Sequence, residues 1–338
     1  MKVLITGGAG FVGSRFHEML TDLGHETVRF DLLPPDDKSE FVKGDVRDLE
    51  ALTAAMQGCD AVLHLAAAHH DFGIATQTFH DVNVMGMENV CAAMLTNSIK
   101  RLCFYSTVAV YGEQKPPVDE STTPAPISDY GKTKLLAEAV CEKWSQQGNG
   151  NRCLVMRPTV IFGPNHFANM YTLVRQIESG KFVCVGKMEN IKSLAYIDNI
   201  VNATIELWLN DAGDASGYQC LNYIDKPDLS SRQIVNEIYK GLEKNPPKIF
   251  IPYPIAQLLA LPFDLIIKLT GKNLPISSAR IRKLAVSNTQ VEADKVHQAT
   301  KLKGIPLKDG IQNMVQWYVS KGKQLKQSNR RPHATESK

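Results

Sequence analysis

Two side chains one helical turn apart form the clearest catalytic pair in the sequence. Tyr130 and Lys134 open a segment with a helical pattern, in the run YGKTK. Residues i and i+4 share a helix face, so the phenol and the ammonium point the same way. A free phenol, with a pKa of about 10, is a poor base at neutral pH, but a cation at about 5 Å favours the phenolate by about 3 kcal/mol. The spacing therefore predicts a tyrosine that acts as a general base.

Hydroxyl side chains at the end of a predicted strand strengthen this interpretation. Ser106 and Thr107 follow apolar residues in the run FYSTVAVYG, at the carboxyl edge of a parallel sheet, where ligands bind. Their hydroxyls can hydrogen-bond to a reacting oxygen and orient it. A Tyr-x-x-x-Lys pair alone also occurs on the surface of many helices, and these hydroxyls favour the catalytic interpretation.

A glycine-rich turn near the N-terminus is typical of a phosphate-binding loop. Gly7, Gly10 and Gly13 have G-x-x-G-x-x-G spacing between an apolar strand and an amphipathic helix. The missing Cβ atoms allow a sharp turn, the approach of a pyrophosphate and close packing of helix and strand. The first N–H groups of the helix, those of Phe11 and Val12 among them, then face the phosphates. The turn predicts a dinucleotide site.

An acidic residue after the second predicted strand favours NAD over NADP. A carboxylate at Asp31 can accept hydrogen bonds from the adenosine ribose and would repel a 2′-phosphate. The alternative is a carboxylate that only stabilises a turn. Further residues expected to line the cofactor are Asp45 and Val46, in the run GDVRD, and Leu65, Ala66 and Ala67, in the run HLAA.

Short β-rich runs alternate with helical patterns in the first half of the chain. We expect strands at residues 2–6, 27–31, 61–66, 102–106 and 153–157, and helices near 11–23, 48–57, 76–97 and 130–147. The strand runs are apolar on both faces, and their alternation with helices predicts an α/β fold with a doubly wound parallel (Rossmann-type) sheet. This domain is expected to comprise residues 1–162 and about 196–222. A smaller mixed C-terminal substrate lobe is expected from about 163–195 and 223–320.

The composition excludes several classes of protein. The 338 residues are 43% hydrophobic and 22% charged, as in ordinary folded chains, and a net charge of +3 gives no argument for nucleic-acid binding. Seven cysteines without metal-ligand spacing indicate reduced thiols in the cytoplasm. The start MKVLIT lacks the pattern of a signal peptide. The polar, basic residues 321–338 predict a disordered tail.

The most hydrophobic segment covers residues 249–267. Its longest uncharged run has 15 residues and contains three prolines, whereas a membrane span needs about 20 apolar residues. The sequence therefore predicts no transmembrane segment. We interpret this stretch as a buried helix, and peripheral membrane contact is the alternative.

Six motifs occur together in the order and spacing of a known family. With TGGAGFVG, GDVRD, HLAA, STVAVYG, YGKTK and RPTVIFGP, the chain resembles extended short-chain dehydrogenases/reductases of the NAD-dependent epimerase/dehydratase branch over about residues 1–320. The resemblance implies that Thr107 is the catalytic Ser/Thr, Tyr130 the base and Lys134 the residue that binds the nicotinamide ribose. It implies a supporting role for Asn83, and a nicotinamide-lining loop that contains Pro158 and Val160. It also implies NAD as cofactor and a homodimer formed by paired helices.

The two residues that directly follow Thr107 limit which of the reactions implied by the resemblance this chain can catalyse. Members that are 4,6-dehydratases typically carry acidic residues there, whereas this chain has Val108 and Ala109, which cannot transfer protons. The leading hypothesis is an NAD-dependent nucleotide-sugar epimerase that inverts C4. The alternatives are a net oxidoreductase, either a 4-ketosugar reductase or a 3β-hydroxysteroid-type dehydrogenase, and a non-catalytic dinucleotide sensor.

Weaker candidates for substrate binding are a histidine and three cations. His69 could line the substrate pocket, and the cations could reach a diphosphate, although a solvated surface explains each cation equally well: Lys192, Arg280 and Arg282. His69, His70, Asp71 and His80 have no further clustered ligand, so we expect no metal site there.

Overall fold

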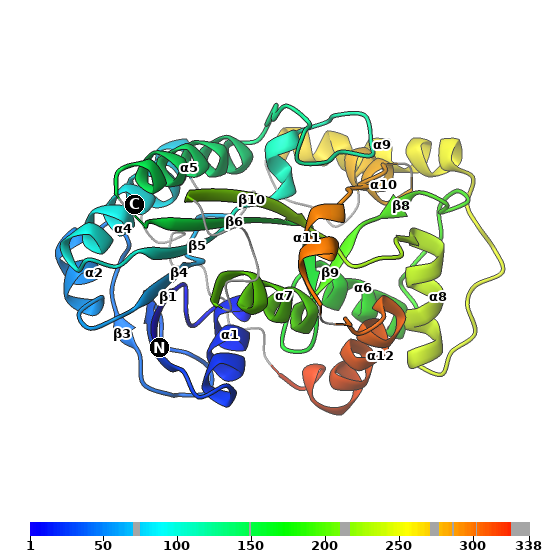
Figure 1. The fold of residues 1–338 in the computed structure, drawn as a ribbon. Coiled ribbons are helices and arrows are strands. Elements are labelled where there is room, and N and C mark those ends of the chain that lie inside the picture. Colours follow the sequence, from blue (N-terminus) through cyan, green and yellow to red (C-terminus); the bar gives the residue numbers. More distant parts are fainter. Residues whose placement is uncertain are drawn as a thin grey trace.

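A parallel sheet forms the centre of the computed structural model, which describes residues 1–69, 75–148, 150–209, 217–270, 277–285, 287–301 and 303–325 (Figure 1). Within these residues the sheet has seven strands in the order β10-β6-β5-β4-β1-β2-β3. Every neighbouring pair is parallel. The strands are β1 (Lys2–Thr6), β2 (Glu26–Asp31), β3 (Val42–Lys43), β4 (Ala61–His64), β5 (Arg101–Tyr105), β6 (Arg152–Pro158) and β10 (Gly217–Tyr223). The predicted doubly wound fold is confirmed, and the strand order reverses between β1 and β4, where such folds bind ligands.

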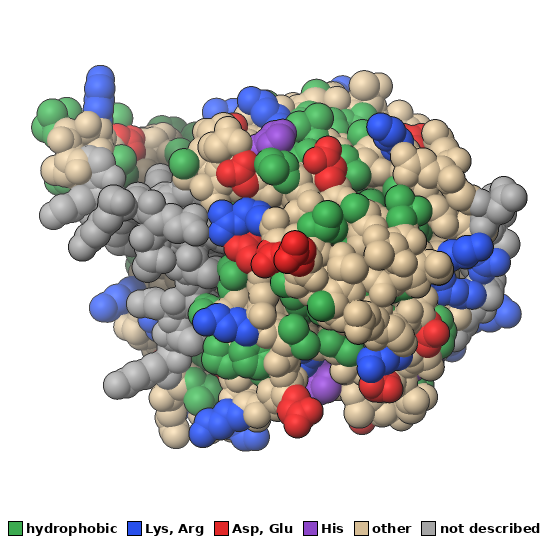
Figure 2. All heavy atoms as spheres, turned by 90° about the vertical axis from the view of Figure 1, so that its left-hand side faces the viewer, with side chains coloured by type: hydrophobic (Ala, Val, Ile, Leu, Met, Phe, Trp, Pro, Cys, Tyr) green, Lys and Arg blue, Asp and Glu red, His purple; other side chains and the backbone are tan. Residues whose placement is uncertain are grey.

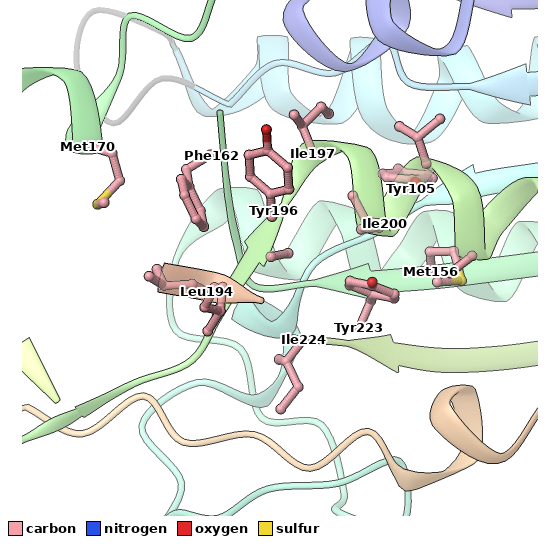
Figure 3. Close-up of a cluster of buried hydrophobic side chains, with 14 of the residues drawn as sticks. Tyr105, Met156, Phe162, Met170, Leu194, Tyr196, Ile197, Ile200, Tyr223 and Ile224 are labelled. Carbon is pink, nitrogen blue, oxygen red and sulfur yellow. The ribbon is translucent and has the colours of Figure 1, made fainter. Parts of the chain in front are cut away.

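Helices cover both faces of this sheet, because successive strand residues point to opposite sides. Val3 and Ile5 of β1 belong to one buried cluster, and Leu4 belongs to the other. The first cluster lies against α1 (Phe11–Asp22) and α7 (Ile197–Leu209); Figure 3 shows part of it, with Tyr105 near Ile200. The second is covered by α2 (Leu49–Ala55), α4 (Gly86–Thr96) and α5 (Asp129–Gln146).

The helical segment predicted at residues 76–97 contains a π turn. It consists of α3 (Thr76–His80), the π turn η1 (Asp81–Met85) and α4. A π turn inserts an extra residue into a helix and is frequent at functional sites. Asn83, at its centre, is buried.

The remaining elements form a smaller lobe beside the carboxyl ends of the strands. Two short strand pairs, β7 with β9 and β8 with β11, lie in it. α7 returns to pack on α1, and β10 pairs with β6. β7 pairs with β9 of this lobe, although it lies within the range predicted for the first domain. The division into two domains stays a prediction. The lobe elements are β7 (Val160–Phe162), α6 (Asn169–Glu178), β8 (Ile191–Lys192), β9 (Leu194–Tyr196), β11 (Leu229–Ser230), α8 (Ser231–Gly241), α9 (Tyr253–Thr270), α10 (Ser278–Ala285), α11 (Asp294–Ala299), α12 (Leu307–Trp317) and η3 (Tyr318–Gly322).

One prediction about this lobe is wrong. The apolar stretch at 249–267 forms the helix α9, but only 11% of this helix is buried. Ala256 and Ala260 are its only buried residues among those described. Apolar composition favours burial, but a helix that contacts the fold through one narrow stripe leaves its other side chains exposed. Of the predicted disordered tail, residues 321–325 are described, and 326–338 lie outside the described residues.

Candidate active site

The turn after β1 has the tight geometry that its glycines predict. Gly7 has a φ of +65°, and a Cβ atom there would lie 2.8 Å from the backbone nitrogen of Ala66. A Cβ on Gly13 would clash with the carbonyl oxygen of Gly7. Gly10, the N-cap of α1, provides no side-chain cap, so the first N–H groups of this helix suit an anion. The turn therefore fits the pyrophosphate of a dinucleotide.

A cavity of about 180 Å³ lies over this turn and the ends of the neighbouring strands. Eight of the residues predicted to bind the cofactor line it: Gly7, Gly10, Asp31, Asp45, Val46, Leu65, Ala66 and Ala67. His69, predicted for the substrate, also lines this cavity. The cavity is placed as the adenosine half of a dinucleotide requires.

Two carboxylates at this cavity have different partners. Asp31 accepts hydrogen bonds from the backbone N–H groups of Ala9 (3.0 Å) and Leu33 (3.2 Å), which hold its side chain beside the glycine turn. Asp45 pairs with Arg47, with 2.6 Å between Oδ2 and Nη2. Asp31 therefore lies where the predicted contact with the ribose needs it, whereas Asp45 is held by its own cation.

The three predicted catalytic residues lie together at the ends of two elements. Thr107 caps the short 3₁₀ helix η2 (Val108–Tyr111), accepting a hydrogen bond of 3.1 Å from Ala109. Its hydroxyl also hydrogen-bonds to the hydroxyl of Tyr130, in the first turn of α5. One turn further along α5, the ammonium of Lys134 lies 4.1 Å from the centre of the Phe104 ring. The structure thus joins residues that are far apart in the sequence.

Lys134 is not among the groups that shift the pKa of Tyr130. Burial raises the pKa of Tyr130 to about 12, and the hydrogen bond with Thr107 only partly offsets this rise. Burial likewise lowers the pKa of Lys134 to about 7, against the opposing effects of Cys141 and Glu138. Spacing alone predicted an acidified phenol because the loss of hydration around both groups cannot be read from a helical pattern.

Ser106 does not face the cavity as the sequence suggested. Its hydroxyl donates to Glu138, a buried residue of α5 that sequence analysis missed. Glu138 also pairs with Arg157 at the end of β6, with 2.9 Å between Oε1 and Nε. This carboxylate therefore joins α5 to the ends of β5 and β6. Its position four residues after Lys134 was a usable signal.

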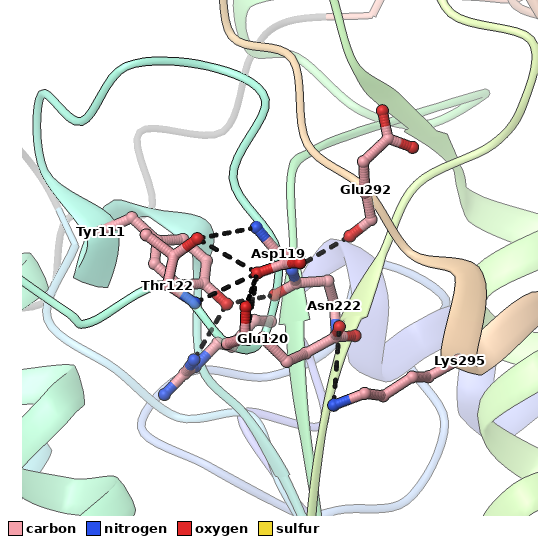
Figure 4. A network of polar contacts seen from close by, with 9 residues as sticks. Tyr111, Asp119, Glu120, Thr122, Asn222, Glu292 and Lys295 are labelled. Carbon is pink, nitrogen blue, oxygen red and sulfur yellow. Dashed lines mark hydrogen bonds and ion pairs between the residues drawn. The ribbon is translucent and has the colours of Figure 1, made fainter.

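The same arginine extends a polar network into the smaller lobe. Arg157 donates to the hydroxyl of Tyr111 (3.0 Å), which donates to Asn222 of β10 (2.8 Å). Figure 4 shows Tyr111 and Asn222 among the acidic residues Glu120 and Glu292. The backbone N–H of Asn222 donates to Glu120 at 2.8 Å. The network fixes η2, and with it Thr107, relative to the edge of the sheet.

Asn83, for which the resemblance implied a supporting role, joins two segments. Its amide accepts a hydrogen bond from the backbone N–H of Ala68 (2.8 Å) and donates to the carbonyl of Ala68 (3.1 Å). It also donates to the hydroxyl of Thr133 in α5 (2.9 Å). The loop after β4 is thus tied to the helix that carries Tyr130.

A buried arginine behind the glycine turn was also missed. Arg29 of β2 donates through Nε to the carbonyl of Gly8 (2.8 Å) and through Nη2 to the hydroxyl of Ser14 (2.8 Å). Its Nη1 pairs with Asp37 at 2.7 Å. Burial raises the pKa of Asp37, but the hydrogen bonds from Arg29 and Ser39 outweigh it and lower the pKa to about 2. A charged residue inside the apolar run TVRFD was the available signal.

A second cavity, of about 860 Å³, lies beside the start of α1 and extends to the smaller lobe. Phe11, predicted for the cofactor, lines it and stacks on His166, with ring centroids 4.2 Å apart. Burial, with a smaller effect of His69, lowers the pKa of His166 to about 4, so this ring is neutral at pH 7. Arg15, Asp198 and Tyr196 also line this cavity.

The remaining predicted residues lie at varied distances from these cavities. Val12 lies in the first turn of α1, Pro158 is buried at the end of β6, and Val160 begins β7 with 44% of its surface exposed. Lys192 donates to the carbonyl of Ser287 at 2.6 Å, and Arg282 is exposed on α10. Neither cation lines the two cavities above.

Some candidates cannot be placed. The side chain of Arg280, and His70 and Asp71 entirely, lie outside the described residues, and His80 ends α3. Among the residues that the structure does describe, no three His, Cys, Asp or Glu side chains form a group that could hold a metal ion.

Comparisons with known proteins agree with this geometry. The model of the NAD dependent epimerase/dehydratase family matches residues 3–218. The N-acetyl-alpha-D-glucosaminyl-diphospho-ditrans,octacis-undecaprenol 4-epimerase of Escherichia coli O157:H7 is 40% identical over 323 residues, covering 94% of this chain and 95% of the relative. The UDP-glucose 4-epimerase of Lactobacillus helveticus is 27% identical over 61% of this chain and 71% of the relative.

Solved structures share the fold. A UDP-glucuronic acid 4-epimerase from Bacillus cereus, in complex with NAD, superimposes with a TM-score of 0.73 at 21% identity, over 94% of this chain and 98% of that one. A UDP-galactose 4-epimerase gives a TM-score of 0.72 at 22% identity, over 96% and 100% of the two chains.

Proposed function

The chain belongs to the NAD dependent epimerase/dehydratase family, and from this premise we propose that it inverts C4 of an N-acetylhexosamine joined through a diphosphate to a polyprenol. It is an NAD-dependent enzyme that acts on a small molecule. The family, the enzyme class, the cofactor and the epimerase function predicted from the sequence are confirmed.

One structural observation carries the epimerase chemistry. Thr107 and Tyr130 share a hydrogen bond, and Lys134 follows one turn later on the same helix, at the carboxyl edge of the sheet. A dinucleotide sensor has no need of these three groups in this arrangement. Their contact favours an enzyme over the non-catalytic alternative.

The carrier of the sugar is proposed from the breadth of the similarity. The relative named for a polyprenyl-diphosphate sugar is 40% identical across nearly the whole of both chains, so its similarity includes the smaller lobe. The relative named for UDP-glucose matches only 61% of this chain. We therefore favour a lipid carrier over the nucleotide carrier of the leading hypothesis.

The residues of the chain have distinct proposed tasks. The glycine turn and Asp31 hold the cofactor, which when bound accepts a hydride from the sugar carbon and returns it. Tyr130 takes the proton of the C4 hydroxyl and, after the keto-sugar has turned over, returns a proton to the C4 oxygen as the carbon is reduced on its opposite face. The hydroxyl of Thr107 donates to Tyr130 and stabilises its phenolate. Lys134 supplies a positive charge on the same face of α5.

The residues after Thr107 limit the reaction to epimerisation or net redox chemistry. Val108 and Ala109 in η2 provide no acid or base, so the elimination of water lacks its proton-transfer groups. An epimerase regenerates its cofactor, whereas a ketosugar reductase or hydroxysteroid-type dehydrogenase changes the NADH concentration with every turnover.

Turnover assays distinguish these possibilities. The full chain with NAD is incubated with polyprenyl-diphosphate-linked N-acetylglucosamine, and separately with UDP-N-acetylglucosamine, and NMR identifies the product sugar while absorbance follows NADH. We expect the C4 epimer from the lipid-linked sugar without net NADH. A stoichiometric change in NADH would contradict an epimerase. Conversion of the UDP-sugar alone would instead support the hypothesis that the substrate is a nucleotide sugar.

We also propose a cytoplasmic homodimer. All seven cysteines are free and six are buried, as expected in a reducing compartment. Apolar side chains are exposed along η1, α4 and α5: Met85 (45%), Leu95 (50%) and Leu136 (49%). Figure 2 shows the side of the molecule on which α2 and α4 lie, where hydrophobic side chains are scattered among charged ones. Light scattering should give twice the chain mass, and Leu136→Glu should lower it.

A further inference from the structure

The helix α9 of the smaller lobe exposes an apolar surface to solvent. It is 18 residues long with a mean hydropathy of 1.3, and only 11% of it is buried. Figure 1 shows it at the periphery of this lobe, beside α10. Seven of its large apolar side chains have exposed fractions between 45% and 76%: Ile255, Leu258, Leu259, Leu261, Leu265, Ile266 and Leu269.

These side chains form a continuous stripe along the helix. At about 100° per residue, Ile255, Leu258, Leu259, Leu265, Ile266 and Leu269 fall within an arc of about 120°. The buried Ala256 and Ala260 lie on the other side of the helix. A helix that packs on a core turns its most apolar side toward the protein. α9 turns its most apolar side toward solvent.

Two hydrogen bonds hold α9 beside the lobe, and both reach Ser278. Gln257 donates to the carbonyl of Ser278 at 3.1 Å. Asp264, the only acidic residue in the helix, accepts a hydrogen bond of 3.0 Å from the backbone N–H of Ser278. Both contacts join α9 to the start of α10, and they anchor the side of the helix opposite the apolar stripe.

The sequence around α9 carries an excess of positive charge. The sequence from residue 244 to residue 283 contains seven Lys or Arg residues and one acidic residue, Asp264. Lys248, before the helix, Lys268, in its last turn, and Arg282, on α10, are exposed. An apolar helix face with basic neighbours suits the surface of an anionic bilayer, in which the side chains enter the acyl boundary and the cations contact phosphates. A protein partner needs no such excess of positive charge.

We propose that α9 docks this enzyme on the surface of a membrane that contains anionic phospholipid, with the stripe from Ile255 to Leu269 immersed in the interface. The proposal rests on the proposed function, since a polyprenyl-linked sugar resides in a bilayer and a docked enzyme meets it there. In this proposal lipid molecules contact the apolar stripe, and the helix axis lies parallel to the membrane plane.

Vesicle sedimentation tests the docking without any substrate. The full chain is mixed with vesicles of phosphatidylcholine, with or without phosphatidylglycerol. We expect sedimentation with the anionic vesicles, reduced roughly tenfold in the double variant Leu258→Glu/Leu265→Glu. The matched control is Leu23→Glu, at an equally exposed leucine (60%) at the end of α1, which should sediment like the wild type. Thermal unfolding and NAD binding verify that each variant is folded.

Turnover separates this inference from the proposed function. The double variant should lose activity on lipid-linked sugar in vesicles and keep it on a water-soluble, short-chain diphosphate analogue. Sedimentation of the wild type, lost in the variant, would support docking even if no lipid-linked sugar were converted, and the proposed function would then fail alone. Wild-type protein that stays in the supernatant, or a variant that sediments equally, would overturn the docking. If the variant became monomeric but still bound vesicles, the apolar stripe would instead be a contact surface between two copies of this chain.

Discussion

At the residue scale, the site combines two groups whose burial opposes their charged forms. Tyr130 and Lys134 share a face of α5, and burial raises the pKa of the phenol while it lowers that of the ammonium. The hydroxyl of Thr107 is the contact that favours the phenolate. The sequence predicted which groups meet, but their ionisation depends on solvation, which spacing does not contain.

Tyr130→Phe should lower kcat at least about a hundredfold, because the variant lacks the proton-transfer group. NAD affinity, measured by fluorescence or calorimetry, should change little, since the ring is retained. Tyr239→Phe, in α8 of the smaller lobe, is the control and should leave kcat unchanged. Normal turnover in Tyr130→Phe would reject this residue as the base.

Lys134→Met should abolish turnover but stabilise the folded chain at low pH. The pKa of Lys134 falls from 10.5 to about 7 on folding, so between these values the unfolded chain binds more protons, and wild-type stability rises by about 1.4 kcal/mol per pH unit. The variant lacks this dependence. Its advantage in urea unfolding should be greatest below about pH 7 and shrink toward about pH 10. The exposed Lys132→Met is the control, and a pH-independent difference would contradict the buried ammonium.

Asp31→Asn should raise the affinity for NADP relative to NAD by roughly tenfold, because the charge that repels a 2′-phosphate is removed. Binding of both cofactors to the full chain measures the ratio. Asp22→Asn, at the exposed end of α1, should not change it. If the ratio of NADP to NAD affinity were unaltered in Asp31→Asn, Asp31 would only stabilise the turn and would not select the cofactor.

At the element scale, Glu138 joins three elements that must hold the site in register. It contacts Ser106 after β5 and Arg157 at the end of β6, and it stands on the same helix as Tyr130. Removing one partner of a buried ion pair leaves the other charge without compensation. The position of the base thus depends on an interaction one turn beyond the catalytic pair.

Glu138→Gln should therefore lower the free energy of unfolding by about 3 kcal/mol, measured by urea denaturation. Glu18→Gln, which removes the surface partner of Arg15, should have little effect. Equal stabilities of Glu138→Gln and the wild type would show that Arg157 finds another partner.

The sequence predicted the central elements closely because buried parallel strands are apolar on both faces. β1 coincides with the run from Lys2 to Thr6, and α1, α5 and β6 begin and end within one or two residues of their predicted bounds. The π turn η1 has no local sequence signal, since its extra residue is set by packing. The exposure of α9 was missed because hydrophobicity does not state what a side chain is buried against.

At the scale of the whole molecule, the proposed docking of α9 confines enzyme and substrate to one surface. Turnover should then follow the mole fraction of lipid-linked sugar in the bilayer, and added phospholipid at constant total sugar should slow it. The water-soluble analogue is the control, and its rate should be unaffected. A rate that depends only on bulk concentration would show that the enzyme extracts its substrate into solution.

The position of β10 in the chain has a consequence for biosynthesis. This strand pairs with β6 along its full length, yet between the two strands the ribosome must first deliver β7, α6, β8, β9 and α7. Until Gly217–Tyr223 emerges, the hydrophobic strand β6 has an unpaired edge, to which other chains can add. We therefore expect this edge to be the part of the nascent chain most open to wrong pairing late in translation, after the cofactor loop has already been made.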